Sequence, residues 1–97
     1  ISTTVPTQAL ALMNSPFVRQ QAERLAQRVR PSPEIPLPGA IEQAYRVAFG
    51  RLPSDAERNR MQTYIEQQSG SDPGAMKAAL VEFCQVLLCL NEFVYVD

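Results

Sequence analysis

The sequence predicts an all-α fold: a compact bundle of four main helices with a short N-terminal helix and a proline-rich loop. Apolar residues recur at three- and four-residue spacing through most of the 97 residues. Ser-Pro, Gly and Ser-x-x-Glu signals, typical of helix ends, separate these segments. No strand pair is expected. The length fits a single domain, 1–97, and 45% hydrophobic content with 20% charge argues against disorder.

Two helices are expected before the proline-rich loop. A short one covers Gln8–Asn14. Ser15 is a strong N-cap for the second, Pro16 suits its first turn, and it should end near Arg30. Its inner face is expected to consist of Phe17, Val18, Ala22, Leu25, Ala26 and Val29.

Residues 31–39 hold four of the eight prolines and are predicted to form a loop. They are either a plain connection between helices or a recognition segment for a small adaptor domain. The next helix, 40–49, should end at Gly50, a natural left-handed cap. Its inner stripe is expected to contain Ile41, Ala44, Tyr45 and Ala48.

Ser54 and Glu57 form a capping-box pattern at the start of a helix that runs to about Ser69. This helix is expected to bury Met61, Tyr64 and Ile65. The last helix, 75–90, is apolar around most of its circumference, which is typical of a central buried helix. Its narrow polar strip contains Lys77, Glu82 and Gln85.

The composition excludes several kinds of chemistry. Without histidine, the chain lacks Ser-His-Asp and Cys-His catalysis and the histidine ligand of c-type haem. A net charge of −1 and pI near 5.4 argue against nucleic-acid binding. Carboxylates are scattered and the glycines form no phosphate loop. No catalytic, metal or cofactor site is predicted in this chain.

The most apolar segment, 78–90, is interrupted by Glu82 and Gln85 and is shorter than the ~20 residues of a membrane span. We therefore expect no membrane span, and we expect the chain to be a fragment of a longer protein. Cys84 and Cys89 would lie about 8–9 Å apart on one helix, too far for a disulfide. They are either a redox or metal pair or two buried thiols.

Candidate interaction residues are polar or lie in the apolar tail. Four arginines and one glutamate give residues 1–33 a charge of +3, which suits an anionic ligand, a solvated face or attraction to the acidic C-terminal part of the chain. Arg51 can contact the last carbonyls of the preceding helix or pair with Glu57 or another acidic residue. The other candidates, for contacts with a neighbouring domain or for internal caps and tail packing, are Gln8, Asn14, Asn91, Glu92, Phe93 and Tyr95.

Three segments carry a family resemblance: TTVPTQALALMNSPFVRQQAERLAQRV, AYRVAFGRLPSDAE and LLCLNEFVYVD. Together they resemble the C-terminal region of a planctomycete family catalogued as domain of unknown function 1553. The resemblance implies an exported, extracytoplasmic multidomain parent, often joined to a cytochrome c domain, so haem would lie elsewhere in that parent. The matching residues are Pro6, Thr7, Gln8, Ala9, Leu10, Asn14, Phe17, Gly50, Arg51, Pro53, Glu57, Asn91, Glu92, Phe93, Tyr95, Val96 and Asp97.

Two functions follow as hypotheses. The first is a non-catalytic helical module that packs against, or completes, the upstream domains of its parent. The alternative is a domain that binds an external glycan or protein, or that belongs to an enzyme acting on surface polymers. An open pocket lined by tyrosine and carboxylates would favour the alternative. The sequence leaves the oligomeric state open.

Overall fold

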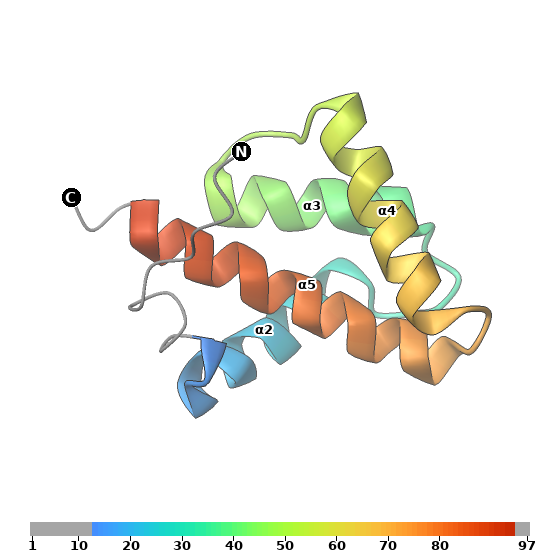
Figure 1. Cartoon of the computed structure of the whole chain (residues 1–97), viewed down its shortest axis with the longest axis horizontal. Coiled ribbons are helices and arrows are strands. Elements are labelled where there is room, and N and C mark those ends of the chain that lie inside the picture. The colour runs from blue at the N-terminus through green and yellow to red at the C-terminus, as the bar shows by residue number, and fades with distance from the viewer. Residues whose placement is uncertain (1–12, 95–97) are drawn as a thin grey trace.

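The computed structural model describes residues 13–94 (Figure 1). Within that range the chain forms four helices and no strand: α2 (Pro16–Val29), α3 (Leu37–Phe49), α4 (Asp55–Ser69) and α5 (Pro73–Val94). The predicted all-α class is confirmed. The short helix predicted for Gln8–Asn14 lies outside the described residues except for its last two positions.

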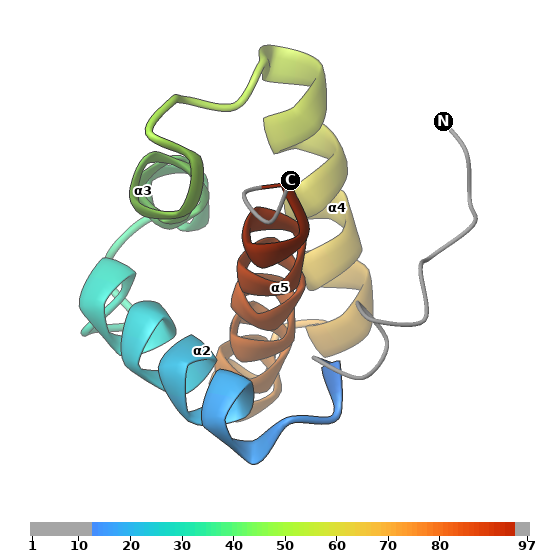
Figure 2. The same cartoon turned by 90° about the vertical axis from the view of Figure 1, so that its left-hand side faces the viewer.

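The longest helix, α5, is central, as its apolar circumference predicts. Figure 2 shows α2, α3 and α4 arranged around it, and all three contact it. Its buried side chains include Leu80, Phe83, Cys84 and Leu87. The core cluster also contains Ala79 and Val81 of α5 and eleven residues of the other three helices, five of them alanines: Ala22, Leu25, Ala26, Val29, Leu37, Ala40, Ile41, Ala44, Tyr45, Ala48 and Ile65.

The helix-end signals predicted at Ser15, Gly50 and Ser54 are confirmed. The hydroxyl of Ser15 accepts from the Val18 backbone N–H at 3.4 Å at the start of α2. Gly50 ends α3 with φ of 70°, a conformation that glycine adopts without the steric cost of a side chain. The capping box at Ser54 has both of its hydrogen bonds. At the start of α5, the Asp72 carboxylate accepts from the Gly74 N–H at 3.1 Å.

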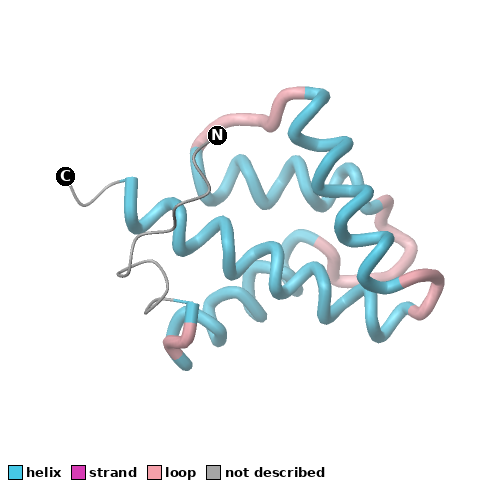
Figure 3. Tube along the Cα trace, in the orientation of Figure 1, coloured by secondary structure: helices cyan, strands magenta, loops and turns pink. Residues whose placement is uncertain are grey.

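The proline-rich loop is shorter than predicted, because α3 already begins at Leu37 and includes Pro38 and Gly39 in its first turn. The first N–H groups of a helix have no intrahelical acceptor, so a proline there costs nothing. The guanidinium of Arg30 holds the remaining loop by donating to the carbonyls of Ile35 at 2.9 Å and Pro33 at 3.0 Å. Figure 3 shows this loop and the loop between α3 and α4 as separate connections.

The last helix also extends beyond its predicted range of 75–90. It begins at Pro73, which is tolerated at a helix start, and it continues through Val94. Residues 91–94 contain neither glycine nor proline, so nothing in their backbone chemistry ends the helix.

Three predicted burial states are wrong, and Met61, predicted to be buried, is only half-buried against the core. Phe17 is 68% exposed because it shares a helix face with Gln21 and Arg24 rather than with the buried stripe. Tyr64 is 44% exposed because it lies one residue away from the inward-facing Ile65 on α4. Gln85, expected in a polar strip, is buried.

By length and composition, one window among the described residues, Pro73–Leu90 of α5, is apolar enough to cross a membrane. The central helix of a folded bundle meets the same criterion, and α5 is packed against three other helices. The expectation of no membrane span stays a prediction.

Candidate functional site

The two thiols are the strongest nucleophiles among the described residues, and both are buried. Burial raises the pKa of Cys84 to about 12 and also raises the pKa of Cys89. Because the thiolate is the reactive form, both stay protonated and unreactive at neutral pH. No group of three or more Cys, Asp or Glu within residues 13–94 could hold a metal ion. The burial of both side chains supports the interpretation of two buried thiols.

Arg51 forms the most elaborate polar cluster that the structure describes. Its Nη1 and Nη2 donate to Oε1 and Oε2 of Glu57 at 3.1 and 3.3 Å, a two-pronged ion pair. Nη1 also donates to the Leu52 carbonyl at 3.0 Å, and Oε1 of Glu57 accepts from the Ser54 N–H at 2.8 Å. Of the two contacts expected for Arg51, pairing with Glu57 is the one observed.

Two aromatic rings lie beneath the guanidinium of Arg51. Its central carbon is 5.5 Å from the ring centre of Tyr45 and 5.8 Å from that of Phe49, within cation–π range. The Arg51 and Ser54 hydrogen bonds lower the pKa of Glu57 to about 2. The pKa of Tyr45 is raised, chiefly by its burial and then by the charge of Glu57.

This cluster connects α3 to α4. Both carboxylate oxygens of Glu57 accept internal hydrogen bonds, and the Arg51 fork is directed at them. The geometry therefore explains Arg51 as a residue that holds the connection between α3 and α4 in place. Its additional use in contacts with a partner stays a prediction.

A second feature is a shallow groove of about 200 Å³ where α2, α3 and α5 meet. Its apolar floor is formed by Leu25, Val47 and Leu88, one residue from each helix. Its polar rim is on α2 and contains Gln21, Arg24 and Arg28. We call these six residues the arginine-rimmed groove.

The two rim arginines form no ion pair with the described residues. Within residues 13–94, the ion pairs join Arg51 to Glu57 and Arg58 to Glu42 and Asp55. None of these ion pairs involves Arg24 or Arg28, whose side chains are exposed. The groove thus combines an apolar floor with two positive charges that lack an ion-pair partner in the described part of the chain.

Phe17 extends the same surface. It lies one turn before Gln21 on α2, and positions four apart share a helix face. A large aromatic side chain that is mostly exposed beside an apolar groove is a feature of protein-binding surfaces.

Of the predicted interaction residues, the structure describes the side chains of Asn14 and Arg51. Asn14 is exposed in the turn before α2, far along the chain from Arg51 at the end of α3. Gln8 and Tyr95 lie outside the described residues. Asn91, Glu92 and Phe93 belong to the last turn of α5, and their side chains also lie outside the description.

The sequence reasoning missed the groove. Phe17, Gln21, Arg24 and Arg28 follow helical spacing, so their shared face could have been found from the sequence. Val47 and Leu88 come from helices distant in the chain, and their place beneath the arginines depends on helix packing.

The comparisons with known proteins give a family. The family model described as PSD1, protein of unknown function (DUF1553), matches residues 1–65, about two thirds of the chain. The match includes α2, α3 and α4 as far as Ile65 and ends before α5. No curated protein and no solved structure matches the chain. The chain belongs to the DUF1553 family.

Proposed function

We propose that this member of the DUF1553 family is a non-catalytic helical module that packs against the other domains of a larger exported protein. The arginine-rimmed groove carries this proposal. Apolar residues bordered by charged side chains on α2 have the composition expected of part of a protein–protein contact, which combines a desolvated apolar centre with polar groups at its edge.

The groove indicates the chemistry of the partner surface. A hollow of about 200 Å³ accommodates one bulky apolar side chain above Leu25, Val47 and Leu88. Carboxylates on either side of that side chain would pair with Arg24 and Arg28, and two-pronged arginine–carboxylate contacts provide orientation. We place this acidic, apolar-centred surface on the upstream domains of the parent chain.

The proposed context follows from the resemblance. It implies an extracytoplasmic planctomycete parent that often contains a cytochrome c domain, and such a domain is one form of the upstream partner. Any haem would be held there, and the chain itself would bind no cofactor.

The alternative, binding of an external glycan, has one candidate surface. A shallow hollow on α4 is lined by Asn59, Arg60, Thr63, Tyr64 and Gln67. A pocket lined by both tyrosine and carboxylates would favour sugar binding. This hollow has an exposed tyrosine, but its lining contains no carboxylate. The arginine-rimmed groove therefore supports the first function better.

The test is a titration of the purified chain against the separately produced upstream part of its parent, followed by light scattering. We expect a 1:1 complex that weakens as salt is added, because exposed charges are screened. The double variant Arg24→Glu/Arg28→Glu should weaken binding by about tenfold or more, and Val47→Asp should weaken it similarly.

Matched controls lie on other surfaces. Arg60→Glu makes the same substitution at one arginine on α4, half the charge change of the double variant, and Leu52→Asp matches Val47→Asp at an exposed residue between α3 and α4. Both should bind as the unchanged chain does. A folded chain that forms no complex, or one that responds equally to all four variants, would contradict the proposal.

A further inference from the structure

A pocket of about 180 Å³ lies where the end of α2, the loop after it and the start of α5 meet. Three prolines contribute to its lining, and we call it the proline-walled pocket. The residues that line it are Ala26, Gln27, Arg30, Pro31, Pro33, Pro73, Lys77 and Leu80. None of them lines the arginine-rimmed groove, so the two sites are separate.

The local sequence explains how the pocket is built. On α5, Pro73, Lys77 and Leu80 follow four- and three-residue spacing, which places them on one face of the helix. On the other side, Arg30 donates from Nε to the Ile35 carbonyl at 2.9 Å and from Nη2 to the Pro33 carbonyl at 3.0 Å. These two hydrogen bonds hold the proline-rich loop against the end of α2. The buried side chains of Ala26 and Leu80 give the pocket an apolar floor.

Both charged residues of the pocket are cations. The ion pairs within residues 13–94 involve Arg51 and Arg58, and none involves Arg30 or Lys77. Residues 1–12 contain no aspartate or glutamate. The Arg30 guanidinium is already oriented by the loop carbonyls, so it loses little side-chain freedom when it binds a ligand. The pocket therefore favours an anionic occupant.

We propose that the proline-walled pocket binds a monocarboxylate whose apolar part is about the size of a benzene ring. The carboxylate would pair with Arg30 and Lys77, and the apolar part would contact Ala26 and Leu80. A cavity of about 150 Å³ holds benzene, so a pocket of this volume suits such a ligand. Inorganic phosphate fits less well, because the apolar floor would desolvate its oxygens without giving them hydrogen bonds.

Two sources could supply this chemistry: a free small acid, or the C-terminal leucine or phenylalanine of a peptide. Both present a carboxylate beside an apolar group. The proposal does not depend on the function proposed for the arginine-rimmed groove, because it concerns a different face of the molecule.

Lys77 is the only lysine of the chain and its side chain is exposed, which allows a direct test. The probe 4-methylpentanoate is added to the full chain, and acetylation of Lys77 by an N-hydroxysuccinimide ester is followed by mass spectrometry. Saturating probe should slow the acetylation by about threefold or more, because the paired ammonium is less available. The neutral 4-methylpentanamide, and acetate at the same concentration, should give little protection. Equal protection by the amide or by acetate would overturn the proposal.

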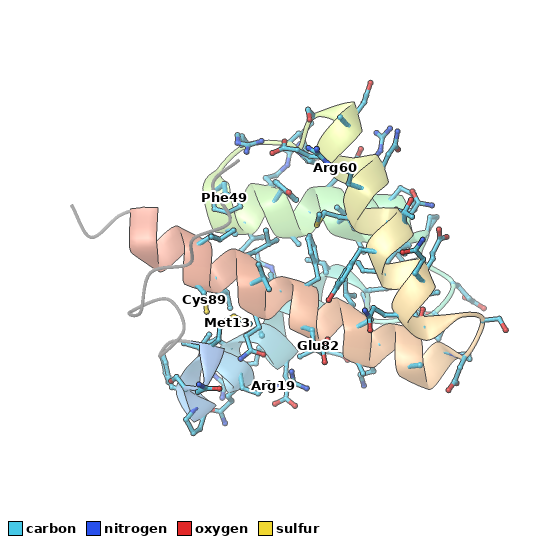
Figure 4. All side chains as sticks on the ribbon, viewed as in Figure 1. Met13, Arg19, Phe49, Arg60, Glu82 and Cys89 are labelled. Atoms are coloured by element: carbon cyan, nitrogen blue, oxygen red, sulfur yellow. The ribbon has the colours of Figure 1, made fainter. Side chains whose placement is uncertain are left out.

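Charge variants test the contact with the ligand carboxylate. Affinity for 4-methylpentanoate is measured from the NMR shifts of the backbone amides of Gln27 and Leu80. Lys77→Gln should weaken binding by about threefold, the size expected for one exposed ion pair, and Lys77→Arg should retain most of the affinity. The control Arg60→Gln removes one positive charge from α4, and Figure 4 shows Arg60 separated from α2 by α5. Equal weakening by Lys77→Gln and Arg60→Gln would show a general charge effect and refute the site.

A peptide distinguishes the two sources of the carboxylate. Acetyl-Gly-Gly-Leu with a free C-terminus is titrated beside 4-methylpentanoate, with the C-terminally amidated peptide as its control. Tighter binding of the free-carboxyl peptide would assign the pocket to a chain terminus, and tighter binding of 4-methylpentanoate would assign it to a free acid. The absence of saturable shifts at Gln27 and Leu80 with both carboxylates would overturn the proposal.

Discussion

The helices α4 and α5 are neighbours in the chain and in space, yet different forces hold them in place. Most side chains in the middle of α5 are buried, including Leu80, Phe83 and Cys84. In α4 only Ile65 and Ser69 are buried. Instead, α4 has a capping box, the Arg51–Glu57 pair and the ion pair between Arg58 and Glu42 of α3 at 3.2 Å.

The difference shows that two kinds of interaction stabilise this small domain. Burial of apolar surface is the larger contribution and is concentrated around α5. Caps and exposed ion pairs contribute about 1 kcal/mol or less each, but they fix where α4 begins and how it leaves α3. The following predictions test this division, from the largest expected effect to the smallest.

Truncating one aromatic residue on each helix should give very different results. Phe83→Ala removes a buried ring that stacks near Tyr45, and it should lower the free energy of unfolding by about 3–5 kcal/mol. Tyr64→Ala on the exposed side of α4 should change it by less than about 0.5 kcal/mol. Urea denaturation measures both. Similar losses of unfolding free energy in the two variants would contradict the view that burial around α5 is the larger contribution to stability.

Ile65 is the main apolar anchor of α4. Ile65→Ala should cost about 2–5 kcal/mol of unfolding free energy. Hydrogen exchange should rise first in α4, because few other buried contacts hold it. The exposed neighbour Thr63→Ala is the control. An even rise in exchange over α2 and α5 would show that α4 does not open on its own.

The capping box should matter less. Ser54→Ala leaves the Glu57 N–H without its 3.1 Å acceptor and should cost about 1 kcal/mol in unfolding free energy. Ser54→Asn retains an acceptor and should recover most of this loss. If Asn were as destabilising as Ala, the hydrogen bond would not be the cause.

The smallest effect concerns pH. Because the pKa of Glu57 falls from 4.5 to about 2 on folding, its stabilising contribution is complete above pH 4.5. It is lost as the pH falls from 4.5 toward 2. Exposure of the pair to solvent keeps the contribution small. The melting temperature of Glu57→Gln should therefore lie slightly below that of the unchanged chain at pH 7, and the gap should close below pH 4.5. A constant gap across this range would exclude Glu57 as the titrating group.

The sequence alone determined the all-α class and most helix ends. Ser15, Gly50 and the Ser54–Glu57 pair act through the backbone atoms of their nearest neighbours, so their effect does not depend on the rest of the fold. The central position of α5 was predictable for a related reason. A helix with apolar residues around its circumference is stable in water only when other helices cover it.

Only the tertiary structure decided which side chains of each helix are covered. Phe17 and Tyr64 are apolar enough for a core, but the packing of α2 and α4 turns them outward. Gln85 is polar but buried, because Met13 and Arg19 satisfy its amide. The arginine-rimmed groove likewise combines residues from three helices. Local propensity acts over a few residues, whereas burial depends on which distant helix lies alongside.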